Sequence, residues 1–131
     1  MERTPINPVT WSEQFGYHQG ELVTGAQRTL YVAGQTATDE NGAPQHPGDI
    51  GAQLALAVQN VEDVLAGAGM TLSNVVRLKV YTTDVEALMP AYGTLAAKLG
   101  QARVSPPNTL VEVSRLAVPG LLVELEVTAA D

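Results

Sequence analysis

Residues 74–83 read Asn-Val-Val-Arg-Leu-Lys-Val-Tyr-Thr-Thr, and apolar and polar side chains alternate along most of this stretch. Successive side chains of a β-strand point to opposite faces of the sheet. The pattern therefore predicts a strand with Val76, Leu78 and Val80 on one face. The other face receives charged and aromatic groups together with one valine: Val75, Arg77, Lys79 and Tyr81.

Amphipathic helices are predicted before and after this strand. Asp49 can cap the first helix, which Gly67 and Gly69 end and in which apolar residues recur at helical spacing: Ile50, Leu54, Val58, Val61 and Leu65. Pro90 fits the first turn of the second helix, and Gly100 lies beyond its end. The periodic residues of this second helix are Leu88, Tyr92, Leu95 and Leu99.

Four further strands are indicated by composition: 15–23, 28–35, 109–114 and 121–129. Residues 24–27 predict a hairpin connection between the first two, and Pro119-Gly120 predicts a turn between the last two. The polar stretch 36–48 is a predicted loop. Residues 1–13 contain two prolines and are expected to be extended, without a helix.

This order of elements predicts one α+β domain over residues 1–131, with a mixed sheet. Each helix should connect two parallel strands, so both helices cover the same face of the sheet. No internal repeat indicates a second domain. The covered face has enough apolar side chains to form a core: Leu30, Val32, Val76, Leu78, Val80, Val123, Leu125 and Val127.

The opposite face of the sheet has no helix to cover it. It would carry an amphipathic mixture: Tyr31, Arg77, Lys79, Tyr81, Leu122, Glu124, Glu126 and Thr128. Solvent can cover one face of an antiparallel sheet, but aromatic and aliphatic groups among charges are more typical of a subunit interface. The pattern favours a homo-oligomer over a monomer.

Composition argues against several classes of function. The 131 residues include 7 Lys+Arg and 14 Asp+Glu, giving a net charge of −7 with no stripe of cations, so nucleic acid is not expected as a partner. The lack of cysteine excludes disulfides, thiolate nucleophiles and zinc sites with sulfur ligands. No apolar segment has the length of a membrane span or a signal peptide, and we expect a cytoplasmic protein without a membrane partner.

Motif spacing gives little catalytic signal. His18 and His46 lie in different predicted elements, and no phosphate-binding loop or serine-hydrolase motif occurs, so neither a metal nor a cofactor is expected. Glu124 and Glu126 share one strand face, which suits either an acid–base pair or two structural carboxylates paired with cations of the neighbouring strand. Spacing alone favours the structural interpretation.

Several separated segments do carry a family resemblance. They are Gly16-Tyr17-His18-Gln19, 30–35 (LYVAGQ), 48–53 (GDIGAQ), 74–77 (NVVR), 81–84 (YTTD), 107–113 (PNTLVEV), Arg115-Leu116 and 123–126 (VELE). Together they resemble the Rid family, also called YjgF/UK114, from about residue 14 to the end. The resemblance implies a chorismate-mutase-like α+β fold and a homotrimer with three small-molecule clefts at the subunit boundaries. In the best-known branch it also implies hydrolysis of enamines and imines without a metal or cofactor.

The resemblance assigns roles to individual residues. Glu124 matches the glutamate that positions water, Tyr17 a tyrosine that lines the cleft, and Gly34 the backbone that borders the pocket. Asn108 stands where deaminating members have an arginine that holds the substrate carboxylate. The expected site therefore has Glu124 as its catalytic residue and a substrate-binding set of Tyr17, Ala33, Gly34, Asn108, Thr109 and Leu110.

Other departures from the family pattern accompany Asn108. Ala33 replaces a frequent hydroxyl residue, and Leu110 replaces a small polar or thiol residue. The segment 85–92 is about three residues shorter than in the family pattern. The residues around an asparagine that lines the family's pocket are therefore missing. Two functions remain open: a divergent deaminase that hydrolyses an enamine or imine of a carboxylate-poor ligand, or a non-catalytic small-molecule-binding or chaperone-like trimer. The acidic pI of about 4.6 argues against a ribonuclease.

Overall fold

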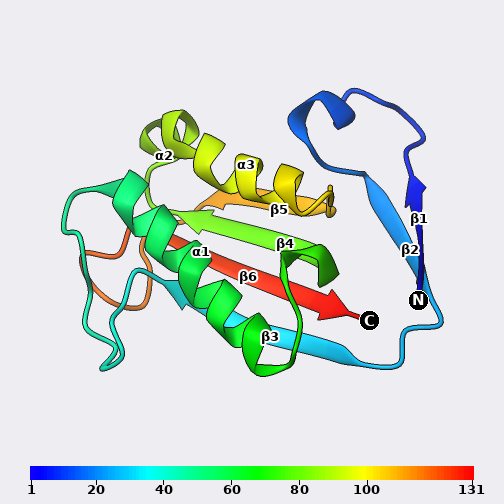
Figure 1. Ribbon diagram of the computed structural model, residues 1–131. Helices are drawn as coiled ribbons and strands as arrows, with labels where there is room; N and C mark the ends of the chain where they lie inside the picture. The colour runs from blue at the N-terminus through cyan, green and yellow to red at the C-terminus, as the bar shows by residue number, and fades with distance from the viewer.

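A four-stranded mixed sheet forms the centre of the computed structural model, which describes residues 1–131 (Figure 1). β6 is antiparallel to both of its neighbours, and the edge strand β5 is parallel to β4. The order across the sheet is β3 (Thr29–Thr36), β6 (Val123–Ala130), β4 (Val75–Thr82) and β5 (Asn108–Glu112). The predicted α+β class and mixed sheet are confirmed.

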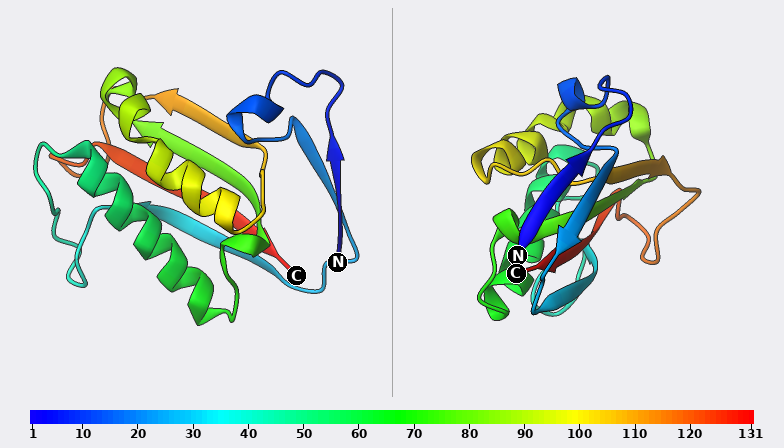
Figure 2. Two further views of the ribbon diagram at one scale, coloured as in Figure 1. Left: turned by 45° about the horizontal axis from the view of Figure 1, so that its top comes forward. Right: turned by 90° about the vertical axis from the view of Figure 1, so that its right-hand side faces the viewer.

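Three helices cover one face of this sheet (Figures 1 and 2). α1 (Ile50–Gly67) connects β3 to β4, while α2 (Val85–Ala91) and α3 (Gly93–Gln101) connect β4 to β5. The Asp49 carboxylate caps α1 by accepting a hydrogen bond from the backbone N–H of Ala52 at 3.0 Å. The predicted first helix and its cap are confirmed.

The predicted second helix is divided at Tyr92, which ends α2 and begins α3. α2 begins directly after Asp84, whose carboxylate accepts a hydrogen bond from the Ala87 N–H at 3.0 Å. The sequence had indicated that Pro90 lies in the first turn of a single helix. In the structure it lies inside α2. Proline has no N–H to donate to the carbonyl of Glu86, and the helix is interrupted two residues later.

The core lies between the sheet and the helices. It contains the predicted apolar face of α1 and most of the predicted strand residues: Leu54, Val58, Val61, Leu65, Val32, Leu78, Val80, Val123, Leu125 and Val127. Val76 is an exception because of a β-bulge in β4. Val75 pairs with Ala129 and Arg77 pairs with Thr128, so Val76 is an extra residue. Val75 is consequently buried and Val76 only half-buried, which reverses their predicted faces.

The N-terminal segment forms a two-stranded ribbon outside the main sheet. β1 (Glu2–Ile6) pairs antiparallel with β2 (Gly20–Thr24), whereas β3 pairs with β6. The predicted hairpin between residues 15–23 and 28–35 is therefore wrong. The short 3-10 helix η1 (Glu13–Phe15) also replaces the end of the extended segment and the start of the strand expected there.

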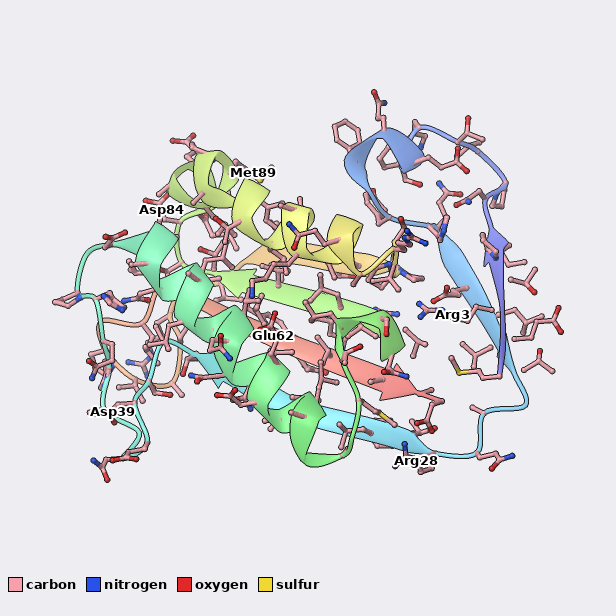
Figure 3. All side chains as sticks on the ribbon, in the orientation of Figure 1. Arg3, Arg28, Asp39, Glu62, Asp84 and Met89 are labelled. Carbon is pink, nitrogen blue, oxygen red and sulfur yellow. The ribbon has the colours of Figure 1, made fainter.

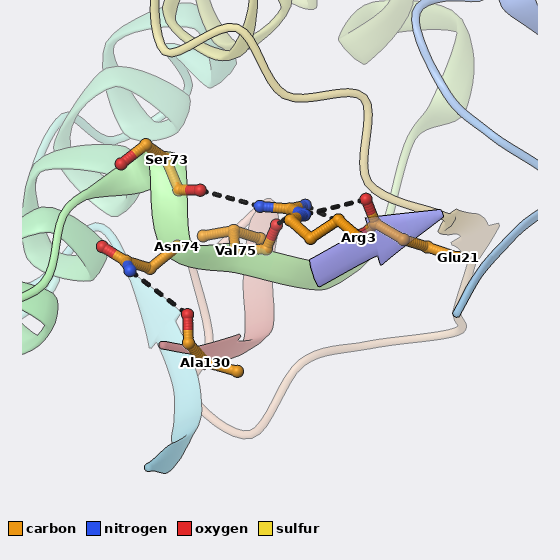
Figure 4. A network of polar contacts seen from close by, with 6 residues as sticks. All are labelled: Arg3, Glu21, Ser73, Asn74, Val75 and Ala130. Carbon is orange, nitrogen blue, oxygen red and sulfur yellow. Dashed lines mark hydrogen bonds and ion pairs between the residues drawn. The ribbon is translucent and has the colours of Figure 1, made fainter. Parts of the chain in front are cut away.

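Arg3 fastens this ribbon to the beginning of β4 (Figure 4). Its guanidinium donates two hydrogen bonds of 2.8 Å to the carboxylate of Glu21. It also donates to the carbonyl oxygens of Ser73 and Val75, each at 2.7 Å. The Glu21 side chain is only 5% exposed, and a carboxylate so removed from water requires a paired cation. This ion pair therefore holds the ribbon in place.

Candidate functional site

The sheet face opposite the helices carries both glutamates of β6. Glu126 is engaged there, because its carboxylate accepts a hydrogen bond from the Tyr81 hydroxyl at 3.1 Å and lies 3.4 Å from the Lys79 ammonium. This confirms the cross-strand pairing of Glu126 with Lys79 that the sequence suggested. Arg77, the other candidate partner, forms no ion pair. Glu126 is thus a structural carboxylate.

The nearby glutamates affect the pKa of the Tyr81 phenol. Partial burial raises the pKa of the Tyr81 phenol above its usual value of 10.0, and the hydrogen bond to Glu126 raises it further. The charge of Glu124 acts in the same direction, whereas Lys79 opposes it. Tyr81 therefore remains a protonated donor at neutral pH, and it holds the Glu126 carboxylate.

Glu124 has a different environment, although it lies only two residues from Glu126. Its carboxylate has no hydrogen-bond or ion-pair partner within the chain, and its side chain lies against the backbone of Gly34 in β3. A Cβ atom at position 34 would fall 2.8 Å from the Glu124 Cδ atom, so a side chain there would displace the carboxylate. The pairing of β3 with β6 shifts between Val32 and Gln35, so Ala33 and Gly34 lie in this irregularity.

The predicted substrate-binding residues of β5 divide between the two faces of the sheet. Thr109 pairs with Lys79 in register and is exposed on the same face as Glu124. Asn108 and Leu110 pair with the core residues of β4 and therefore face the helices. Leu110 packs against the hydrophobic core. Within one chain, these two side chains and the Glu124 carboxylate are on opposite sides of the sheet.

Asn108 and Tyr17 belong to the region where the N-terminal segment meets α3. Asn108 lines a pocket of about 80 Å³ together with Phe15, Gly16 and residues of α3. The ring of the adjacent Tyr17 packs edge-on against Trp11, with ring centroids 6.1 Å apart. One chain thus divides the predicted site residues into two groups. Ala33, Gly34 and Glu124 lie together in one place, and Asn108 lies with the segment around Tyr17 in another.

Gln53 supports the Glu124 strand, and the sequence analysis missed this residue. Its side chain on α1 is completely buried (0% exposed) and accepts a hydrogen bond from the Leu122 N–H at 2.8 Å. It also donates to the carbonyl oxygens of Gly120 at 2.9 Å and His46 at 3.3 Å. Gln53 therefore fixes the chain two residues before Glu124. The available signal was a polar residue at a core-facing position of a predicted helix.

Two features are absent from the structure. Across residues 1–131, no group of three or more His, Asp or Glu side chains is arranged to hold a metal ion. None of the helices combines the length and the apolar character that crossing a membrane requires.

Residues 14–131 match the family described as Endoribonuclease L-PSP. The chain belongs to this family. It is 29% identical over 129 residues to the RutC family protein YjgH of Escherichia coli, covering 98% of this chain and 95% of that one. It is also 30% identical over 113 residues to the 2-iminobutanoate/2-iminopropanoate deaminase of Rattus norvegicus, covering 79% and 80% of the two chains.

Solved structures of the same family have the same fold. The Rid-family protein YyfB from Yersinia pestis is 35% identical and superimposes over 100% of both chains with a TM-score of 0.80. A member of the YjgF/YER057c/UK114 family from Mycobacterium tuberculosis is 32% identical, covers 99% of this chain and 100% of that one, and gives a TM-score of 0.66. The predicted Rid-family resemblance is therefore confirmed.

Replacing Gln53 by leucine should destabilise the fold. The substitution leaves the Leu122 N–H and the Gly120 carbonyl without their buried partner. We expect the free energy of unfolding, measured by urea denaturation, to fall by about 2–4 kcal/mol. Gln59 is exposed on the same helix, so Gln59→Leu should change this free energy by less than about 0.5 kcal/mol. Equal effects of the two substitutions would contradict the role given to Gln53.

Proposed function

We propose that this protein binds a small, carboxylate-poor molecule in a cleft between the subunits of a homotrimer and hydrolyses a C=N bond in it. Glu124 positions the attacking water. The observation that carries the proposal is the Glu124 carboxylate, which is free of partners and lies over Gly34 on the helix-free sheet face. The relative from Rattus norvegicus that is named an iminobutanoate/iminopropanoate deaminase supports this class of reaction.

An assembly of subunits is needed to complete such a site. Glu124 and Asn108 are separated by β4 and lie on opposite faces of the sheet, so one chain cannot present both to the same small ligand. The Glu124 face also exposes apolar surface, since Tyr31 is 79% exposed there. Burying this face against a second copy covers Tyr31 and brings parts of two chains to one cleft.

The proposed reaction requires one group that manages the protons of water. The water oxygen bonds to the carbon of the C=N group, the electron pair moves to nitrogen, and Glu124 takes the water proton. Returning that proton to nitrogen gives a carbinolamine. Glu124 then transfers the hydroxyl proton to nitrogen, the C–N bond breaks as the C=O bond forms, and ammonia or an amine leaves. Glu126 does not suit this role because Tyr81 and Lys79 already occupy its oxygens.

Asn108 determines the class of ligand in this proposal. A guanidinium binds a carboxylate through two charge-assisted hydrogen bonds, which a neutral amide cannot reproduce. Losing such a contact costs about 1.5–3 kcal/mol of binding free energy for a substrate that has a carboxylate there. The pocket beside Asn108 is lined largely by apolar groups, including Phe15 and Leu99. The same neutral pocket suits the second candidate function, a non-catalytic small-molecule-binding or chaperone-like trimer.

The first prediction of this proposal concerns assembly. Light scattering of the purified protein should give the mass of three chains of 13.8 kDa each. Tyr31→Lys places a charge on the apolar part of the uncovered face and should reduce the mass toward that of one chain. A wild-type mass equal to one chain would remove the inter-subunit cleft and the proposal that rests on it.

The second prediction concerns catalysis. Imines generated in the assay from amino acids and from amines should be hydrolysed faster than in buffer, as followed by release of ammonia or amine. Glu124→Gln should lower the turnover number by about 100-fold or more, because the amide cannot take the water proton. Glu126→Gln is the matched control on the same strand face and should retain activity within about threefold.

Gly34→Ala provides an independent variant for the same prediction. The added methyl group displaces the Glu124 carboxylate, the movable end of a side chain, so activity should fall while the protein stays folded. If the wild type accelerates no imine on the panel, the catalytic proposal is wrong and the non-catalytic function takes its place. Equal turnover by wild type and Glu124→Gln would exclude Glu124 from the reaction.

The third prediction concerns the ligand class. Asn108→Arg should raise kcat/KM for amino-acid-derived imines by about tenfold or more, since it supplies two charged hydrogen bonds to a carboxylate. Imines derived from simple amines lack this carboxylate and should gain nothing. An equal change for both substrate classes would contradict the assignment of Asn108 to ligand recognition.

A further inference from the structure

A second pocket, of about 390 Å³, lies between the N-terminal ribbon and the end of α3. Arg3 forms its wall on the ribbon side, where it reaches toward the beginning of β4 (Figures 3 and 4). This end of β4 is remote from Glu124. Glu124 pairs with Tyr81, six residues beyond Val75, which corresponds to about 20 Å along an extended strand. The pocket is therefore distant from Glu124, although it shares Val104 and Ser105 with the pocket beside Asn108.

Arg103 lines this pocket and has an unusual backbone. It follows α3 with φ of 57°, in the left-handed region that glycine or asparagine ordinarily occupies at the end of a helix. Its N–H donates to the Gly100 carbonyl at 3.0 Å, and the next N–H, of Val104, donates to the Leu99 carbonyl at 3.1 Å. The exposed guanidinium has no carboxylate partner. A free cation thus occupies a position where glycine would fit with less strain.

His18 contributes a second donor to the pocket. The Gln19 N–H donates to Asn7 Oδ1 at 2.9 Å, which orients the Asn7 amide so that its nitrogen faces His18 Nδ1 at 3.0 Å. His18 Nδ1 therefore accepts, which assigns the ring proton to Nε2. Nε2 has no partner within the chain. The ring is left with one N–H to offer a ligand.

Ser105 lies next to His18, because its carbonyl accepts a hydrogen bond from the His18 N–H at 2.9 Å. Ser105 lines the same pocket, and its hydroxyl has no hydrogen-bond partner within the chain. Glu21 is the one acidic residue of the lining, and both of its oxygens are taken by Arg3. The lining thus has two arginines against one glutamate, a positive balance on a chain with a net charge of −7.

We propose that this pocket binds a small oxyanion, either a carboxylate or a phosphate group. Arg103 supplies the charged contact, and His18 Nε2–H and the Ser105 hydroxyl donate hydrogen bonds. The free side-chain groups are donors, with no unpaired carboxylate to repel an anion, and guanidinium pairs strongly with both oxyanions. This site does not depend on the proposed hydrolysis, so Glu124→Gln should bind the anion like the wild type.

Calorimetric titration tests the proposal with two probes, inorganic phosphate and acetate, at constant ionic strength set with sodium chloride. Saturable binding of either probe by the wild type is expected, and the probe that binds identifies the class of oxyanion. Arg103→Ala should weaken binding at least about tenfold. Arg115→Ala is the matched control, because Arg115 is also exposed and has no ion pair but lies in another loop. Its affinity should stay within about twofold of wild type.

Arg103→Gly separates anion binding from folding. Glycine relieves the left-handed backbone, so the Tm without anion should rise by about 2–6 °C. The further rise in Tm that the bound anion causes in the wild type should disappear in this variant. Binding of neither probe, or equal losses in Arg103→Ala and Arg115→Ala, would overturn the proposal.

Discussion

The central position of β6 is the constraint on which most of this structure depends. Both edges of β6 are hydrogen-bonded to antiparallel neighbours, and its residues alternate between buried and half-buried positions. Val123, Leu125 and Val127 enter the core under the helices, so Glu124 and Glu126 must lie on the opposite face. A shift of one residue would bury both carboxylates and expose the three valine and leucine side chains. The register of this one strand therefore fixes the core and the candidate site together.

Neighbouring strands then give the two glutamates different chemistry. Glu126 lies across from Lys79 and within reach of the Tyr81 hydroxyl, which satisfy its charge. Glu124 meets the irregular part of β3, where Gly34 leaves space for its side chain but offers no cation. The loop that leads into β6 is held from the helix side by the buried Gln53. Packing thus holds the Glu124 carboxylate beside the backbone of Gly34, and no cation neutralises its charge.

Sequence patterns predicted the features that depend on neighbouring residues. They did not predict the features that depend on which distant strands pair. The α1 face, the alternation of β6 and the helix-covered core followed from periodicity, whereas the bulge at Val76 depends on how β4 pairs with β6. Residues 24–27 read as a hairpin because turn signals do not reveal that β2 pairs with β1 instead. Ala33, Gly34 and Glu124 do lie together, but the roles of all the predicted site residues remain predictions. Gln53 was missed because two of its partners, Gly120 and Leu122, lie in a loop that is distant in the sequence.

The distribution of ion pairs bears on which ligands this member of the family can attract. Arg3, Arg28, Lys79 and Lys98 are each paired with a carboxylate. The remaining cations are Arg77 on the sheet face, Arg103 after α3 and Arg115 in the loop before β6, which are three separate places. An RNA backbone requires a continuous track of unpaired cations, because its affinity comes from many phosphate contacts. Isolated guanidinium groups on an acidic chain instead favour small anions, each bound at one point, over a polynucleotide.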